Sequence, residues 1–328
     1  MKLLVTGGYG FIGSNFIERC FKLKKNIKII NIDALLTGSH TSNLNKSNKN
    51  YKFVKGNICN KKLLQRLISQ SDCIINFAAE THVDRSIVDS KNFLQSNLIG
   101  VHSILEELRK NNHVKLIHIS TDEVYGEILK GSFKEKDQLN PSNPYSATKA
   151  SAEMMIRSYV RTYDIDAVIT RCTNNYGPKQ FPEKLIPKTI ISALKNIPIP
   201  IHGKGNSKRQ WIHVDDHCDA ILKILSKKTP SLTYNVGGNY ETTNLTLVKK
   251  ILHMMNKSIK LISFVDDRPG QDRRYSVNDS LIKHDLGFSP KINFELGLKN
   301  TIDWYLKNQD WWKKLSFSKI KNPTPWKK

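Results

Sequence analysis

The chain has 328 residues, enough for about two domains of roughly 150 residues each. No apolar run reaches the roughly 18 residues of a membrane-spanning helix, and the sequence starts with a predicted strand, so we expect neither a membrane span nor a signal peptide. Five scattered cysteines without a C-x-x-C pair favour reduced thiols and a cytoplasmic location. The formal net charge is +23, but 41 Lys and 11 Arg are spread along the chain, which does not indicate a specific nucleic-acid reader.

A glycine-rich turn follows the first predicted strand, Lys2–Thr6, and opens a helical pattern. In this context Gly7 permits the turn, Gly10 lets the backbone approach a pyrophosphate, and Gly13 lets helix and strand pack closely. The free N–H groups at the helix start, at 11–12, would face the phosphates. The pattern therefore predicts a dinucleotide site.

The second predicted strand, Ile27–Ile32, ends in Asp33. A carboxylate at this place accepts hydrogen bonds from the adenosine ribose hydroxyls and repels a 2′-phosphate, so it favours NAD over NADP. Further strands at Tyr51–Val54 and Cys73–Phe77 alternate with helical patterns. Across residues 1–120 this alternation predicts an α/β fold with a Rossmann-like, doubly wound parallel sheet.

The stretch Ser120–Gly126, S-T-D-E-V-Y-G, follows an apolar strand at 114–119 that only Lys115 and His118 interrupt. It places two neighbouring carboxylates, at 122 and 123, at the carboxyl end of a buried strand. Open α/β sheets bind their ligands at this edge. We therefore expect the chemistry of the protein here.

Tyr145 and Lys149 lie four residues apart on a predicted helix, hence on one face. An ammonium beside a phenol favours the phenolate, and a positively charged nicotinamide adds to this effect. We therefore expect Tyr145 to act as a base near neutral pH.

The predicted strand Asp166–Arg171 completes the main body of the first domain. We expect an NAD-binding domain at 1–172, to which 210–236 returns, and a smaller α/β substrate domain built from 173–209 and 237–328. Arginines in the loops of this second domain would suit a diphosphate, although solvated salt bridges give the same pattern. The Trp- and Lys-rich tail after Lys307 is either a docking arm or a segment that packs or frays.

His213 and His217 have the spacing of metal ligands on a helix. Asp215 and Asp216 stand between them and break the H-E-x-x-H pattern, so we expect packing and hydrogen bonding and no metal.

Several longer motifs resemble a known family. The glycine motif, Y-x-x-x-K and the order of elements are similar to the extended short-chain dehydrogenase/reductase superfamily. Within it, the chain resembles the nucleotide-sugar 4,6-dehydratases, above all those of dTDP-glucose, from Lys2 to about Tyr305. The segments that show this resemblance are T-D-E-V-Y-G (121–126), F-A-A-E-T-H-V-D-R-S (77–86), N-N-Y-G-P-x-x-F-P-E-K-L-I-P (174–187) and D-R-P-G-x-D-R-R-Y (267–275).

The resemblance implies NAD as cofactor, a nucleoside-diphosphate glucose as substrate, and site residues placed by these motifs. The implied cofactor contacts are Gly7, Gly10, Phe11, Ile12, Gly13, Asp33, Asn57, Ile58, Ala78, Ala79, Ser96, Tyr145, Lys149 and Asn175. The implied substrate contacts are Thr81, Thr121, Asn174, Lys184, Leu185, Pro200, His202, Arg209, Asn244, Asp267, Arg268 and Gln271. The implied catalytic residues are Thr121, Asp122, Glu123, Tyr145 and Lys149.

The implied reaction is a loss of water in which the cofactor ends as it began. Tyr145 takes the proton of the glucose C4 hydroxyl while a hydride passes to NAD⁺. The resulting C4 ketone acidifies C5–H, which Glu123 removes, and a protonated Asp122 donates to the departing C6 hydroxyl before the hydride returns to C6. The two neighbouring carboxyls need opposite protonation states, which burial and mutual repulsion can provide.

The chain departs from the family pattern at four positions near the base and diphosphate. Asn57 and Gln210 stand where Asp is usual, His202 where an aromatic residue is usual, and Gln271 where His is usual. These departures leave the choice between thymidine and uridine open. A UDP-glucose 4,6-dehydratase that feeds a UDP-rhamnose pathway is therefore an alternative.

Other function classes explain the sequence less well. A sugar-nucleotide 4-epimerase or decarboxylase would not need the acid–base pair Asp122 and Glu123, and a fold reused as a nucleic-acid-binding scaffold is suggested by the charge alone. The resemblance also points to a homodimer that pairs the helices 92–110 and 146–162 in a four-helix bundle. The helix Phe93–Arg109 has an apolar stripe of Leu94, Leu98, Val101, Leu105 and Leu108.

Overall fold

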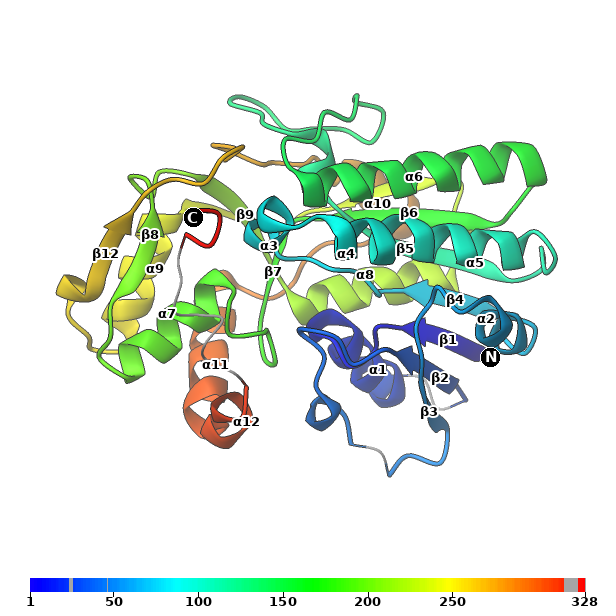
Figure 1. Cartoon of the computed structure of the whole chain (residues 1–328), viewed down its shortest axis with the longest axis horizontal. Helices are drawn as coiled ribbons and strands as arrows, with labels where there is room; N and C mark the ends of the chain where they lie inside the picture. The colour runs from blue at the N-terminus through cyan, green and yellow to red at the C-terminus, as the bar shows by residue number, and fades with distance from the viewer. Residues whose placement is uncertain (24–25, 46, 316–323, 328) are drawn as a thin grey trace.

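The computed structural model describes residues 1–23, 26–45, 47–315 and 324–327. Within these residues, seven strands form one parallel sheet in the order β10-β6-β5-β4-β1-β2-β3 (Figure 1). The order runs outward in both directions from β1 and β4, so the predicted Rossmann-like, doubly wound sheet is confirmed. The strands are β1 (Lys2–Thr6), β2 (Lys28–Asp33), β3 (Tyr51–Lys55), β4 (Cys73–Asn76), β5 (Lys115–Thr121), β6 (Ala167–Cys172) and β10 (Thr233–Val236).

Helices cover both faces of this sheet because its strands are apolar on both sides. On β1, Leu3 and Val5 join one core cluster and Leu4 joins the other. The first cluster includes residues of α1 (Phe11–Leu23) and α8 (Val214–Ser226). The second includes residues of α2 (Lys61–Ile68), α5 (Gly100–Leu108) and α6 (Pro144–Tyr163), which lie across the opposite face (Figure 1).

A smaller α/β unit lies beside the carboxyl ends of the large sheet (Figure 1). Its three-stranded sheet has the order β11-β9-β7, and β12 pairs with β8. The strands are β7 (Asn174–Tyr176), β8 (Ile199–His202), β9 (Lys208–His213), β11 (Tyr240–Thr243) and β12 (Ile262–Val265), and the helices are α7 (Leu185–Leu194), α9 (Asn244–Met254), α11 (Phe294–Lys307) and α12 (Gln309–Lys313).

The segment 210–236 is divided between the two units. Its strand β10 is an edge strand of the large sheet, where it pairs with β6. Its helix α8 packs on one face of that sheet. The end of β9 belongs to the smaller sheet, where it pairs with β7 and β11. The α10 helix (Ser280–Leu286) also packs on β10 and the first core cluster.

The predicted helix Phe93–Arg109 is interrupted. It consists of α4 (Lys91–Phe93), a π-helical segment Leu94–Ile99, and α5. A π turn contains more residues than an α turn, so it rotates the side chains that precede it away from an α-helical stripe. Within the predicted apolar stripe, Leu94 is 46% exposed, whereas three later members are buried: Val101, Leu105 and Leu108.

The first part of the C-terminal tail packs against the protein. Trp312 is buried, and the Trp311 indole donates a hydrogen bond to Asn43 Oδ1 at 2.7 Å. The expectation of a docking arm falls partly on 316–323, which lie outside the described residues. In the described part of the chain, no helix is both long enough and apolar enough to cross a membrane.

Candidate active site

A cavity of about 280 Å³ lies at the carboxyl ends of β1, β4, β5 and β6. All the predicted cofactor and catalytic residues line it: Gly7, Gly10, Phe11, Ile12, Gly13, Asp33, Asn57, Ile58, Ala78, Ala79, Ser96, Thr121, Asp122, Glu123, Tyr145, Lys149 and Asn175. Four predicted substrate contacts also line it: Thr81, Thr121, Asn174 and Lys184. The other predicted substrate residues belong to the smaller unit and do not line this cavity: Leu185, Pro200, His202, Arg209, Asn244, Asp267, Arg268 and Gln271.

Two glycines of the glycine turn, Gly7 and Gly13, have no room for a side chain. Gly7 has a φ of +67°, and a Cβ there would lie 2.8 Å from the backbone of Ala78. A Cβ on Gly13 would lie 2.5 Å from the carbonyl oxygen of Gly7. The first N–H groups of α1 therefore face a cradle of bare backbone, the arrangement that binds a pyrophosphate.

Asp33 is buried at the end of β2 with its carboxylate held by backbone donors. Its Oδ2 accepts hydrogen bonds from Tyr9 N at 2.9 Å and Ser39 Oγ at 3.2 Å, and its Oδ1 accepts one from Leu35 N at 2.8 Å. Burial raises the pKa of Asp33, and these donors oppose the shift. Asp33 lines the cavity, where a carboxylate could accept hydrogen bonds from ribose hydroxyls.

Asp122 and Glu123 lie in a 3₁₀ turn, Asp122–Tyr125, at the end of β5. The Thr121 hydroxyl accepts a hydrogen bond from Glu123 N and donates one to Asp122 Oδ1, both at 3.2 Å. Asp122 is buried, and among the described residues its Oδ2 has no hydrogen-bond partner. Burial, followed by the charge of Glu123, raises the pKa of Asp122 to about 8, so this carboxyl holds a proton at neutral pH.

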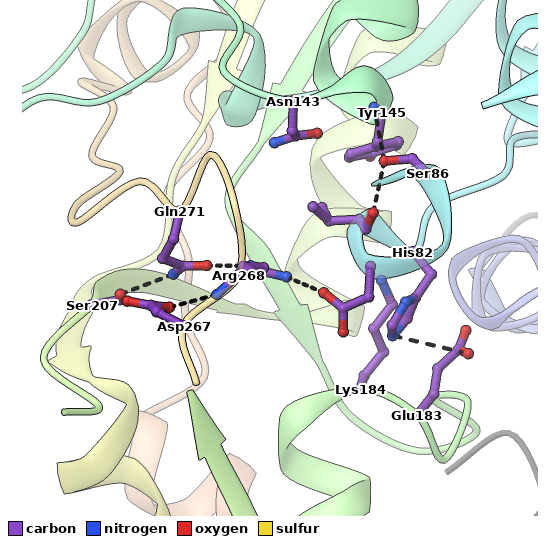
Figure 2. A network of polar contacts seen from close by, with 12 residues as sticks. His82, Ser86, Asn143, Tyr145, Glu183, Lys184, Ser207, Asp267, Arg268 and Gln271 are labelled. Atoms are coloured by element: carbon purple, nitrogen blue, oxygen red, sulfur yellow. Dashed lines mark hydrogen bonds and ion pairs between the residues drawn. The ribbon is translucent and has the colours of Figure 1, made fainter. Parts of the chain in front are cut away.

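Tyr145 begins α6, whose start is fixed by the Asn143 cap and Pro144. Its backbone N–H donates to Ser86 Oγ at 3.2 Å (Figure 2). Burial and then the charge of Glu123 raise the pKa of Tyr145 well above 10. The protein alone therefore holds a neutral phenol, and the expected lowering of this pKa by Lys149 is absent.

Lys149 is turned toward the sheet. Its ammonium donates to Ile119 O at 2.6 Å and lies 3.3 Å from His118 Nε2. Burial lowers the pKa of Lys149 to about 8. His118 Nδ1 in turn lies 3.0 Å from the Asn76 amide nitrogen, and Asn76 Oδ1 accepts from the Thr6 hydroxyl at 2.5 Å. A buried polar chain thus joins β1, β4 and β5 to α6.

Among the cations of the smaller unit that belong to the predicted substrate residues, Lys184 is the one that lines the cavity. Lys184 Nζ donates to Thr81 O at 2.8 Å, which ties the start of α7 to the segment after β4. Arg209 is buried, and its guanidinium stacks on the Tyr275 ring at 4.2 Å. Burial, together with the charge of Arg268, lowers the pKa of Arg209.

The two histidines with metal-ligand spacing have structural partners. His213 caps α8 by accepting a hydrogen bond from Asp215 N at 3.2 Å, and His217 Nδ1 lies 2.9 Å from Asn175 Oδ1. Through Asn175, His217 supports a residue of the cavity wall.

Sequence reasoning gave no role to four residues that contact the site. Glu183 and Arg85 line the cavity and form an ion pair. His118 contacts Lys149, and Asp84 pairs with Arg268 at 2.8 Å. The sequence offered two signals for these roles: a histidine inside an apolar strand, and charged residues inside the family motifs at 77–86 and 174–187. Their interaction partners are distant in sequence, so only the three-dimensional structure identifies them.

Comparisons with known proteins agree with this geometry. The family model described as GDP-mannose 4,6 dehydratase matches residues 4–301. A dTDP-glucose 4,6-dehydratase of Mycolicibacterium smegmatis is 42% identical over 319 residues, which cover 96% of each chain. The dTDP-glucose 4,6-dehydratase of Bacillus anthracis, solved in complex with NAD, has a TM-score of 0.90 and 44% identity over 96% of this chain and all of the other. The enzyme of that name from Streptomyces venezuelae, also solved with NAD, has a TM-score of 0.94 and 39% identity with the same coverage.

Identity at this level over nearly the whole length confirms the resemblance inferred from the motifs. The chain belongs to the family of the dTDP-glucose 4,6-dehydratases, within the nucleotide-sugar 4,6-dehydratases of the extended short-chain dehydrogenase/reductase superfamily.

Proposed function

We propose that this protein is a hydro-lyase that converts dTDP-glucose to its 4-keto-6-deoxy derivative with NAD as cofactor. The protonated carboxyl of Asp122 carries this proposal. It lies beside Glu123 in the cavity, its Oδ2 has no hydrogen-bond partner in the described part of the chain, and its pKa of about 8 keeps it an acid at neutral pH. Epimerisation at C4 needs no such acid, whereas loss of a C6 hydroxyl does.

The residues of the cavity fit NAD. The bare backbone at Gly7 and Gly13 would hold the pyrophosphate, and Asp33 would bind the adenosine ribose. Tyr145 and Lys149 would lie at the nicotinamide end. When bound, NAD supplies the hydride acceptor and donor together with a positive charge near Tyr145.

The residues of the chain divide the proton transfers. The base is the Tyr145 phenolate, which a positive charge on the bound cofactor would favour; it takes the proton from the C4 hydroxyl and becomes the neutral phenol. The Lys149 ammonium, on the same helix and in the same cavity wall, adds positive charge to the site. Once C4 is a ketone, Glu123 removes the acidified C5 proton, and Asp122 donates its proton to the leaving C6 oxygen. The two carboxyls work in opposite directions because only Asp122 is fully buried.

Incubation of the purified protein with dTDP-glucose and, separately, UDP-glucose tests this function. Formation of a 4-keto-6-deoxy product that absorbs after alkali treatment, faster from dTDP-glucose, is the expected result. A galactose product from either substrate would indicate an epimerase. Absence of any product, with strong salt-dependent retention of DNA, would favour the scaffold alternative. Faster turnover of UDP-glucose would assign the protein to the uridine pathway.

The helices predicted to form a dimer interface expose apolar side chains. Leu94 and Ile99 on the helix at 91–108 are 46% and 45% exposed, and Met154 on α6 is 60% exposed. These helices lie side by side (Figure 1). We infer a homodimer through a four-helix bundle. Sedimentation should give a dimer at micromolar concentration; a monomer there, or a dimer unaffected by Ile99→Glu, would contradict this interface.

We also infer a cytoplasmic enzyme of deoxysugar biosynthesis. The five cysteines are free thiols, as a reducing compartment requires. A 4-keto-6-deoxy sugar is a starting point for epimerisation and reduction to deoxyhexoses such as rhamnose. Fractionation of cells and analysis of their nucleotide sugars would test both statements.

A further inference from the structure

We propose that Asp84 is a positioning residue for substrate binding: it holds the Arg268 guanidinium, which would bind the phosphate groups of the nucleotide sugar. The inference rests on the proposed function for the identity of the ligand. It assigns a role to Asp84, which belongs neither to the glycine turn at 7–13 nor to the catalytic stretch at 120–126.

The pair joins two distant parts of the chain. Asp84 lies on α3 (Val83–Val88) in the large unit, and Arg268 lies in the loop after β12 in the smaller unit. Arg268 Nη1 donates to Asp84 Oδ1 at 2.8 Å across 184 residues of sequence. The Arg268 side chain is 22% exposed and the Asp84 side chain 9%, so solvent screens this ion pair less than it screens a pair on the surface.

The guanidinium has a second support. Its Nε donates to Gln271 Oε1, and Gln271 Nε2 donates to Ser207 Oγ at 2.9 Å (Figure 2). In the part of the chain that the structure describes, Arg268 Nη2 has no hydrogen-bond partner. Two nitrogens are thus fixed and the third is left for an anionic acceptor, the geometry with which arginine binds phosphate.

Cations gather around this point. Burial lowers the pKa of Lys184 and of Lys188, with the acids Asp84 and Glu183 opposing the shift. The charge of Arg268 also acts on Arg209 and on Lys188. Grouped positive charges repel one another in the free protein, so a diphosphate that neutralises them gains binding free energy. Burial alone would raise the pKa of Asp84, but the charge and hydrogen bond of Arg268, together with the charges of His82 and His202, outweigh it and lower this pKa.

The α3 helix also contacts the catalytic helix. Ser86 Oγ accepts from Tyr145 N at 3.2 Å (Figure 2). It donates to Val83 O at 2.7 Å. One short helix therefore holds both the Arg268 side chain and the first turn of α6. We expect Asp84 to act mainly on substrate affinity, because its partner Arg268 is a predicted substrate contact, whereas Ser86 contacts the catalytic helix.

The test uses Asp84→Asn in the NAD-loaded enzyme, with dTDP-glucose as substrate. KM should rise about tenfold, and more than kcat falls, since the change loosens one charge-assisted contact. The affinity for thymidine diphosphate should weaken by a similar factor, with NAD content unchanged. The matched control is Asp219→Asn, which breaks the 2.7 Å pair between Arg19 and Asp219. Neither residue lines the cavity, so this change should leave KM unchanged.

A double-mutant cycle shows whether Asp84 acts through Arg268. If it does, Asp84→Asn added to Arg268→Gln should weaken thymidine diphosphate binding no further than Arg268→Gln alone. Additive losses, or an unchanged KM in Asp84→Asn, would overturn the inference. Should Asp84→Asn fail to fold, Asp84→Glu and Arg268→Lys give the same cycle. If wild-type protein binds thymidine diphosphate through this pair but does not dehydrate dTDP-glucose, the proposed function fails and the inference stands.

Discussion

Glu153 and Arg171 form an ion pair directly behind the catalytic stretch, with Arg171 Nη2 2.5 Å from Glu153 Oε2. Both side chains are almost completely buried, at 0% and 1% exposure. Glu153 also accepts from Ser120 Oγ at 2.5 Å, and Arg171 donates to the Tyr125 hydroxyl at 2.6 Å. The pair therefore fixes both ends of the turn that carries Asp122 and Glu123.

Breaking this pair should destabilise the protein strongly. Glu153→Gln leaves the Arg171 charge buried without a counter-ion, so the free energy of unfolding should fall by about 3–5 kcal/mol. Urea unfolding measures this. The control Asp219→Asn breaks the half-exposed pair with Arg19 and should lower the free energy by about 1 kcal/mol or less. Equal losses in the two variants would contradict the importance of burial.

Asp122→Asn should block water loss. An amide cannot donate a proton to the C6 oxygen, so kcat should fall about 10²- to 10⁴-fold. In wild type, the step needs protonated Asp122 with a pKa of about 8, so kcat should decline as the pH rises through about 8. A kcat that stays constant to well above that pH would show that another group donates the proton.

The same variant should change how stability depends on pH. Because the pKa of Asp122 is raised from 3.8 to about 8, the folded protein keeps a proton that the unfolded chain releases in this window. The free energy of unfolding therefore falls as the pH rises through the window. Asp122→Asn removes this dependence, so unfolding experiments at about pH 5 and pH 8 should show the variant gaining on wild type at the higher pH.

Glu123→Gln should separate oxidation from elimination. The variant keeps Tyr145 and Lys149, so C4 oxidation should continue, while removal of the C5 proton should slow by about 10²-fold or more. Exchange of the C5 hydrogen with deuterated solvent, followed by mass spectrometry, reports the second step alone. Unimpaired water loss in this variant would contradict the role assigned to Glu123.

His118 should control the protonation of Lys149. His118→Phe removes the ring nitrogen 3.3 Å from Lys149 Nζ, so the pKa of Lys149, about 8 in wild type, should fall by roughly one unit. The alkaline limit of C4 oxidation in single turnovers should move to lower pH by that amount. His118→Gln, which restores an acceptor, should recover part of the shift. An unchanged pH profile with a lower melting temperature would indicate a packing role only.

Sequence patterns were sufficient for the features that depend on a few neighbouring residues. The glycines of the turn Gly7–Gly13, between a strand and a helix, are enough to predict a dinucleotide site. The position of Asp33 at the end of the next strand is enough to predict a contact with the ribose. Tyr145 and Lys149 share a helical face because four residues make about one turn. Alternating strands and helices allow little other than a parallel sheet, since parallel strands need crossover connections. These motifs also determined the family.

Only the tertiary structure decided the properties that depend on burial and on distant partners. The proton on Asp122 results from the dry environment at the end of β5, and Lys149 faces His118 instead of lowering the pKa of Tyr145. Arg268 contacts Asp84 across 184 residues, and a π-helical segment at 94–99 interrupts the predicted helix Phe93–Arg109. The proton affinity of a side chain and its choice of ion-pair partner depend on the charges and the solvent around it. Folding of the whole chain determines these surroundings, and local spacing in the sequence does not.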